Sequence, residues 1–109
     1  MLKIRVFQTD DGKEPFTEWL GSLSSKTKDR IFDCLYRVEQ GNLGDFKHIG
    51  DHVFELRFFF NGGLRIYFGR DGNEIVILLC GGDKSRQKRD IEKALEYWRQ
   101  YLEQKEEKI

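Results

Sequence analysis

Residues 53–82, VFELRFFFNGGLRIYFGRDGNEIVILLCGG, predict three consecutive β-strands joined by two tight turns. The turn segments 61–63 and 71–73 contain Asn, Asp and Gly, which tolerate the positive φ of hairpin turns. Residues 75–80 are apolar on both faces, as expected of a covered central strand. The first two strands alternate apolar and polar residues, so each has one polar face. We expect that polar face to hold the functional side chains: Glu55, Arg57, Arg65 and Tyr67.

The segment before this meander predicts one strand followed by two helices. Residues 2–8 alternate apolar and polar side chains, which is typical of a strand exposed on one face. Pro15 suits the first turn of a short helix, where a missing N–H costs nothing. Ser24 or Ser25 can cap a second helix over residues 25–40, which has an apolar stripe at helical spacing.

The remaining segments complete a single predicted domain over residues 1–109. Residues 41–52 are rich in Gly, Asn and Asp and predict a loop. A last helix should begin near Ser85, and its tail at residues 103–109 should fray because it has little to bury. The expected fold class is α+β, in the order β-α-α-β-β-β-α, with a small antiparallel-rich sheet and the helices packed on one face.

Composition limits the function classes without selecting one. The 109 residues carry 19 basic and 19 acidic side chains, so a nucleic-acid site would have to come from local clustering. Cys34 and Cys80 lie in apolar patterns and should be reduced and buried. His48 and His52 have no third ligand nearby in the sequence, so we expect no metal site. No apolar run is long enough to span a membrane, and a cytoplasmic protein is expected.

Two groups of basic residues could form such a local cluster. Arg57 and Arg65 share a facing parity on neighbouring strands and could converge on one phosphate, or they could pair across the strands with Glu55. Residues 84–89, KSRQKR, open the last helix with four basic side chains and are either a phosphate-binding segment or a solvated face. We expect both groups to border one basic concavity, with the loop at its rim.

The chain resembles the RelE/ParE superfamily of bacterial toxins, and most closely its HigB-like branch of addiction-module killer proteins, also found in phage. The most specific stretch is residues 55–94, ELRFFFNGGLRIYFGRDGNEIVILLCGGDKSRQKRDIEKA. There a strand with a basic residue is followed by a turn, an Arg-apolar-Tyr strand, an acidic turn, an apolar strand and a basic helix start. The combination is specific, whereas each part alone is not.

The resemblance implies metal-independent, cofactor-free cleavage of messenger RNA on the ribosome. In that reaction the RNA 2′-hydroxyl attacks the neighbouring phosphate, which needs fixed cations and an acid–base pair. The implied partners are ribosome-bound messenger RNA and a helix-turn-helix antitoxin of the HigA/Xre-like kind. Two alternatives share the fold: a poison of DNA gyrase and an inactive module that only binds its antitoxin.

Site residues carry over from the family by position. The expected catalytic residues are Arg65, Arg57, Lys84 and His48. The expected RNA-binding residues are Lys47, Tyr67, Arg86, Gln87, Lys88 and Arg89. Tyr67 could instead be a half-buried sheet residue, and His48 a plain loop histidine. No Tyr close after Gly82 matches the family's base-stacking Tyr, so the general acid and base stay unassigned.

Overall fold

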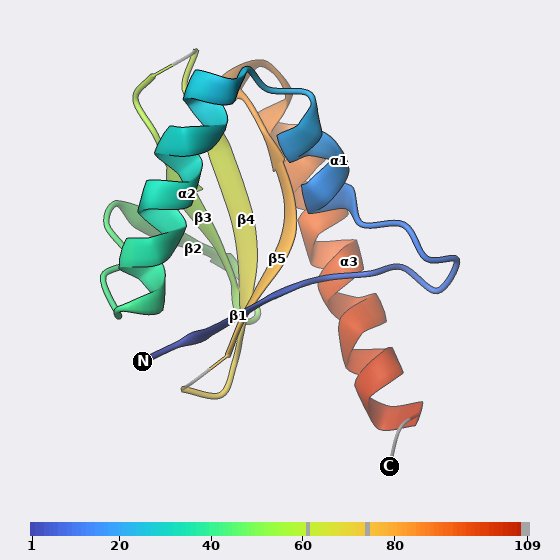
Figure 1. Ribbon diagram of the computed structural model, residues 1–109. Helices are drawn as coiled ribbons and strands as arrows, with labels where there is room; N and C mark the ends of the chain where they lie inside the picture. Colours follow the sequence, from blue (N-terminus) through green and yellow to red (C-terminus); the bar gives the residue numbers. More distant parts are fainter. Residues whose placement is uncertain (61, 74, 108–109) are drawn as a thin grey trace.

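A mixed β-sheet with strand order β1-β5-β4-β3-β2 is the centre of the molecule (Figure 1). The computed structural model describes residues 1–60, 62–73 and 75–107. The strands are β1 (Lys3–Val6), β2 (Phe46–Gly50), β3 (Val53–Arg57), β4 (Arg65–Asp71) and β5 (Ile75–Gly82). β1 runs parallel to β5, and every other neighbouring pair is antiparallel. The α+β class and the antiparallel-rich sheet are therefore confirmed.

The three-strand meander follows from its turn residues and its alternation. Gly62, Gly63 and Gly72 all have positive φ, as the predicted turns require, whereas Asn61 lies outside the described residues. β2 is a correction, because residues 41–52 were expected to be a loop. It is an edge strand whose first three side chains are exposed, so it shows no alternation between buried and exposed positions.

The helices begin and end close to their predicted limits, with one exception. The helical elements are α1 (Pro15–Gly21), α2 (Ser25–Glu39), the short 3₁₀ helix η1 (Lys84–Arg86) and α3 (Gln87–Glu107). Ser24 caps α2 by accepting a hydrogen bond from the Thr27 N–H at 3.2 Å. Residues 103–107, part of the tail that we expected to fray, are helical as far as Glu107, and residues 108–109 lie outside the described part of the chain.

Side-chain contacts hold the last turns of α3 against the sheet and the first loop. Lys105 forms a salt bridge with Asp71 of β4 at 2.7 Å, and the Tyr101 hydroxyl donates to the same carboxylate at 2.5 Å. Gln104 donates from its amide to the Gln8 carbonyl at 2.9 Å and to Asp10 at 3.0 Å. These polar contacts, together with the Tyr101 ring stacked on Trp98 at a centroid distance of 5.1 Å, hold the end of α3 against the sheet.

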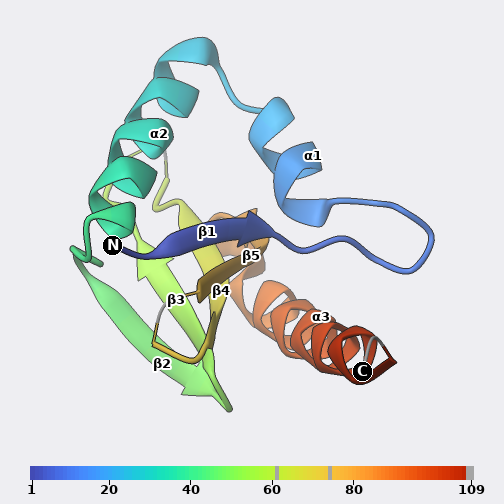
Figure 2. The same cartoon turned by 60° about the horizontal axis from the view of Figure 1, so that its bottom comes forward.

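Helices cover both faces of the sheet, so the prediction that they all pack on one face is wrong. α1 and α2 lie on one side and α3 lies on the other (Figure 2). Two neighbouring glycines at the end of β5 show this directly. A Cβ on Gly81 would lie 2.2 Å from the Trp19 ring of α1, and a Cβ on Gly82 would lie 2.0 Å from the Asp90 carboxylate of α3. Successive residues of a strand point to opposite faces, so α1 and α3 are on opposite sides.

The face that we expected to be an open polar surface is therefore largely a second core. Val53, Ile77 and Leu79 pack beneath Ala94 and Trp98 of α3. Tyr67 and Glu55, expected to face solvent, are 0% and 1% exposed. Cys34 and Cys80 are free and buried, one in each core, as predicted. No helix among the described residues is long and apolar enough to cross a membrane.

Candidate functional site

Arg57 and Arg65 lie directly opposite each other at the end of the β3–β4 ladder. Directly paired residues of antiparallel strands have Cα atoms about 4.5–5.5 Å apart, so the two arginine side chains leave the sheet at neighbouring points. The prediction that they share a face is confirmed. Like charges in directly opposite positions destabilise a sheet, so this pairing needs compensation from its surroundings.

Each arginine has its own carboxylate partner. The Arg57 side chain forms a salt bridge with Asp45 at 3.3 Å, and the Arg57 backbone N–H donates to the Asp45 carbonyl at 3.0 Å. Arg65 lies with its Nε 3.6 Å from Glu55 and donates from Nη1 to the Gly63 carbonyl at 2.7 Å. The Arg57 side chain is 39% exposed, whereas that of Arg65 is 11% exposed. Arg65 is thus fixed by Glu55 and the Gly63 carbonyl, and Arg57 is the more solvent-accessible of the two arginines.

Glu55 is the centre of a buried hydrogen-bond network beneath the arginines. Its Oε2 accepts from the Tyr67 hydroxyl at 3.0 Å and from the Gln87 amide at 3.0 Å. Burial, together with this hydrogen bond to a carboxylate, raises the pKa of Tyr67 far above its ordinary value of about 10. One carboxylate oxygen therefore ties β3, β4 and the first residue of α3 together and balances the charge of Arg65.

Lys84 adds a third cation at the same end of the sheet. Arg65 pairs with Gly82 across the β4–β5 ladder, and η1 begins two residues after Gly82. A Cβ on Gly63 would lie 3.4 Å from Arg65 Nη1 and 3.7 Å from the Cβ of Lys84, so the turn packs between these two side chains. Exposed basic side chains continue along η1 and the first turn of α3: Arg86, Lys88 and Arg89.

Three of the predicted site residues are placed differently. Tyr67 is fully buried, so its ring does not stack on a base, and it is more buried than the half-buried alternative allowed. Gln87 donates from its amide to the buried Glu55 carboxylate. His48 pairs with Phe54 on the face covered by α2, and its Nε2 hydrogen-bonds with the Asp51 carbonyl at 2.6 Å. His48 is therefore not on the face that carries the two arginines.

Lys47 lies on the arginine side of the sheet. The β2–β3 register places it opposite Glu55, and its side chain is exposed. Lys47 therefore remains a candidate RNA-binding residue at the rim of the site, while its neighbour His48 points to the other face.

Two acidic residues of the site were missed by the sequence predictions. Asp45, in the loop before β2, gave no pattern that linked it to Arg57, which lies 12 positions further on. Asp90 directly follows the basic segment 84–89 and was not singled out from the sequence. Its carboxylate packs on Gly82, its Oδ2 is buried without a hydrogen-bond partner among the described residues, and burial raises its pKa.

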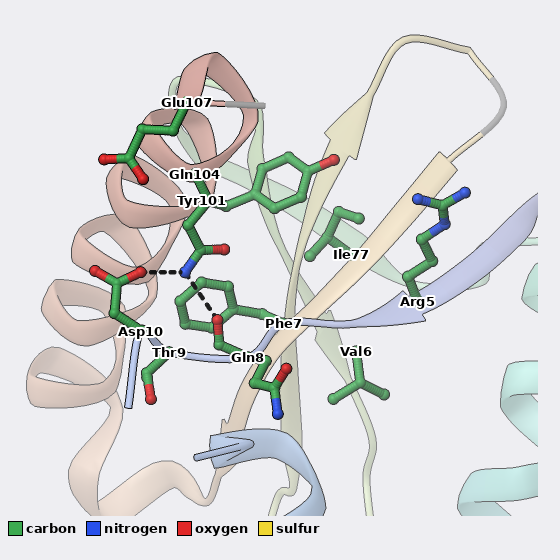
Figure 3. Close-up of a pocket in the computed structure, with 10 residues that line it drawn as sticks. All are labelled: Arg5, Val6, Phe7, Gln8, Thr9, Asp10, Ile77, Tyr101, Gln104 and Glu107. Atoms are coloured by element: carbon green, nitrogen blue, oxygen red, sulfur yellow. Dashed lines mark hydrogen bonds between the residues drawn. The ribbon is translucent and has the colours of Figure 1, made fainter. Parts of the chain in front are cut away.

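A cavity elsewhere on the molecule does not involve the arginine cluster. A space of about 570 Å³ lies between residues 5–10, Ile77 of β5 and the last turns of α3 (Figure 3). It is open and lined by both charged and apolar side chains, with Gln104 bonded across it to the first loop. Among the described residues, no three His, Cys, Asp or Glu side chains gather to form a metal site. The arginine cluster thus remains the candidate functional site.

Comparison with known proteins places the chain among phage-derived proteins. The model of the family described as phage derived protein Gp49-like matches residues 18–99. A protein of Haemophilus influenzae, described only as uncharacterized, is 42% identical over 80 residues, which are 72% of this chain and 81% of that protein. The matched segment of the family model contains all of the arginine cluster and its carboxylates.

Proposed function

The chain belongs to the phage-derived Gp49-like family, a family of toxins from toxin–antitoxin systems, and we propose that it is a type II toxin that cuts messenger RNA on the ribosome. Its site would act on one phosphodiester bond of the bound message. The proposed partners are ribosome-bound messenger RNA and a helix-turn-helix antitoxin of the HigA/Xre-like kind, in the cytoplasm.

The cation cluster would bind the scissile phosphate and stabilise the charge that develops on it. In the proposed reaction the RNA 2′-oxygen forms a bond to phosphorus and the bond to the 5′-oxygen breaks. The 2′-hydroxyl loses its proton and the leaving 5′-oxygen gains one. Negative charge gathers on the phosphate oxygens in the transition state, where preorganised cations contribute most. A planar guanidinium can hold two of these oxygens at once. Arg57, Arg65 and Lys84 lie together at one end of the sheet, where they could bind the same phosphate.

The observation that carries this proposal is the direct opposition of Arg57 and Arg65. A protein that needed only stability would gain by replacing one of two facing like charges. Here both are retained, each is held by a carboxylate, and Lys84 lies beside them. Binding of an anion between the side chains would relieve their repulsion.

The proposal is tested by expressing the chain without an antitoxin and mapping the 5′ ends of cellular transcripts. We expect growth arrest and new transcript ends within translated messages. Arg57→Ala should reduce the rate of cutting by about 10²–10³, which is typical for loss of one charge stabiliser. Arg99→Ala is the matched control, because Arg99 is exposed on α3 about 18 Å further along the helix than Gln87.

Arg65→Ala is a poor first test, because the Arg65 side chain is only 11% exposed and lies beside the buried Glu55 carboxylate. Its removal leaves the buried Glu55 carboxylate without its cation, and breaking a buried ion pair costs about 3–5 kcal/mol. Arg65→Lys keeps the charge and removes the planar fork, so it separates the effect of charge from that of bidentate binding.

Intact transcripts together with a change in DNA supercoiling would refute the nuclease and support a gyrase poison. Undiminished cutting by a folded Arg57→Ala variant would remove Arg57 from the site.

A further inference from the structure

Three consecutive phenylalanines, Phe58, Phe59 and Phe60, join β3 to the turn before β4. Phe58 and Phe60 pack against the core formed with α1 and α2, and their ring centroids are 5.3 Å apart. The guanidinium of Arg30 lies 3.7 Å above the centre of the Phe60 ring. Phe59, between them, is 85% exposed and belongs to neither core.

The exposure of Phe59 has no structural explanation in the fold. The other large apolar side chains that are exposed range from 38% to 65%, except the N-terminal Met1 at 88%. A polar residue at this position would lose no buried contact and would avoid presenting a whole aromatic ring to water. An exposed aromatic ring without packing contacts is more useful to a ligand than to the fold.

The position of Phe59 relates it to the cation cluster. It follows Arg57 by two residues, so the two Cα atoms are at most about 7 Å apart. The Phe58 N–H donates to the Leu64 carbonyl at 2.9 Å, so the ladder continues one step past Arg57. Phe58 and Phe60 both pack on the α2 side, whereas Phe59 packs on neither core and leaves its ring in solvent close to Arg57 in the chain.

We propose that Phe59 is a base-stacking residue, whose ring packs on a nucleobase of the RNA held at Arg57 and Arg65. This inference rests on the proposed function and adds to it the binding of a base. Aromatic rings stack on bases of any sequence, and the phosphate next to the base is bound by the neighbouring cations. Tyr67, the aromatic residue expected to stack, is buried under α3, whereas the Phe59 ring is 85% exposed two residues after Arg57.

The charge around Phe59 favours RNA over a protein as its ligand. Arg57, Arg65 and Lys84 lie at the same end of the sheet and favour a polyanion. A nucleic acid supplies a phosphate and a flat ring within one nucleotide, which matches a guanidinium and a phenyl ring two residues apart. An apolar contact with a protein partner would not require a flat aromatic ring at this position.

Binding to ribosomes that carry a 2′-O-methylated message, which cannot be cut, tests the proposal. Fluorescence anisotropy of labelled protein would measure the affinity. Loss of one stacked base should make binding about 5- to 150-fold weaker for Phe59→Ala and for Phe59→Leu, whereas Phe59→Trp should bind at least as well as the wild type. Phe32→Ala is the matched control, since Phe32 is 51% exposed on α2, which covers the opposite face of the sheet from the two arginines.

Salt dependence adds a second readout. Phe59→Ala removes no charge, so the slope of affinity against salt concentration should not change, whereas Arg57→Ala should reduce it. Full affinity of Phe59→Ala or Phe59→Leu, with Arg57→Ala still weakened, would overturn the stacking role and leave the proposed function intact. Unchanged binding and cutting by Arg57→Ala would instead overturn the proposed function. Melting curves that match the wild type show that the Phe59 variants fold.

Discussion

Tyr67→Phe isolates the hydrogen bond at the centre of the buried network. The substitution removes one hydroxyl and keeps the ring, which is 0% exposed beneath α3. The Glu55 carboxylate, 1% exposed, then loses one of its two hydrogen-bond donors and keeps the Gln87 amide and the nearby Arg65. Water does not reach this oxygen in the native structure, so the lost bond is not replaced.

The expected cost follows from the charge of the acceptor. A hydrogen bond to a charged group contributes about 1.5–3 kcal/mol to stability. For a domain of this length the entropy of unfolding is about 0.23 kcal/mol/K, so each kcal/mol shifts the melting temperature by roughly 4 °C. Tyr67→Phe should therefore melt roughly 6–13 °C below the wild type.

The pH dependence of this effect has a definite sign. The pKa of Tyr67 is raised in the folded state by burial and by its bond to Glu55, so folding favours the neutral phenol. The stabilisation is fully present below the unfolded pKa of about 10 and is lost as the pH rises above it. The gap between variant and wild type should be constant from pH 6 to 9 and should narrow above pH 10.

Thermal unfolding followed by circular dichroism measures the change, with urea unfolding as a second measurement. Tyr36→Phe is the matched control, because Tyr36 is 65% exposed on α2 and should change stability by less than about 0.5 kcal/mol. A melting temperature for Tyr67→Phe within about 2 °C of the wild type would refute the reasoning. It would mean that the hydrogen bond from the Tyr67 hydroxyl to Glu55 contributes little to the stability of the folded protein in solution.

Two further substitutions test the contacts between α3 and the sheet. Gly69→Ala places a Cβ 2.3 Å from the buried Trp98 ring, so we expect a loss of about 1–3 kcal/mol in urea unfolding, and an unchanged midpoint would contradict this packing. Bonds from Lys105 and Tyr101 lower the pKa of Asp71, so its stabilisation is present above the unfolded pKa of about 3.9 and is lost as the pH falls through the folded value. Asp71→Asn should thus be less stable than the wild type at pH 7, and the difference should vanish near pH 2; a difference that persists in acid would show another cause.

The meander was predictable because its signals are local. Alternation with period two and glycine-rich turns determine β3, β4 and β5, and cross-strand parity places Arg57 beside Arg65 without further information. β2 has no such signal. Its exposed edge position leaves no buried stripe, and its pairing with β3 depends on the partner strand rather than on its own residues.

The second helical layer could have been inferred from β5 but not from β3 or β4. β5 is apolar on both faces, which already requires cover on both sides of the sheet. Glu55 and Tyr67 have the residue types of an exposed face but are covered by α3, whose Gln87, 32 positions after Glu55, donates to the Glu55 carboxylate. Pairing between polar groups that are far apart in the sequence has no periodicity, so no local pattern reveals it.

The candidate site combines a buried network centred on Glu55 with the exposed ring of Phe59. A buried ion pair alone is weak evidence of selection for stability, because apolar residues of similar volume are often at least as stabilising. Glu55 and Arg65 are nevertheless kept together, with Arg57 directly opposite at the cost of like-charge repulsion. The carboxylate below fixes the guanidinium of Arg65, and the fixed guanidinium faces a second, accessible arginine. A site built only for stability would need neither that second charge nor an unpacked phenyl ring two residues away, whereas both suit the proposed binding of a phosphate with its attached base.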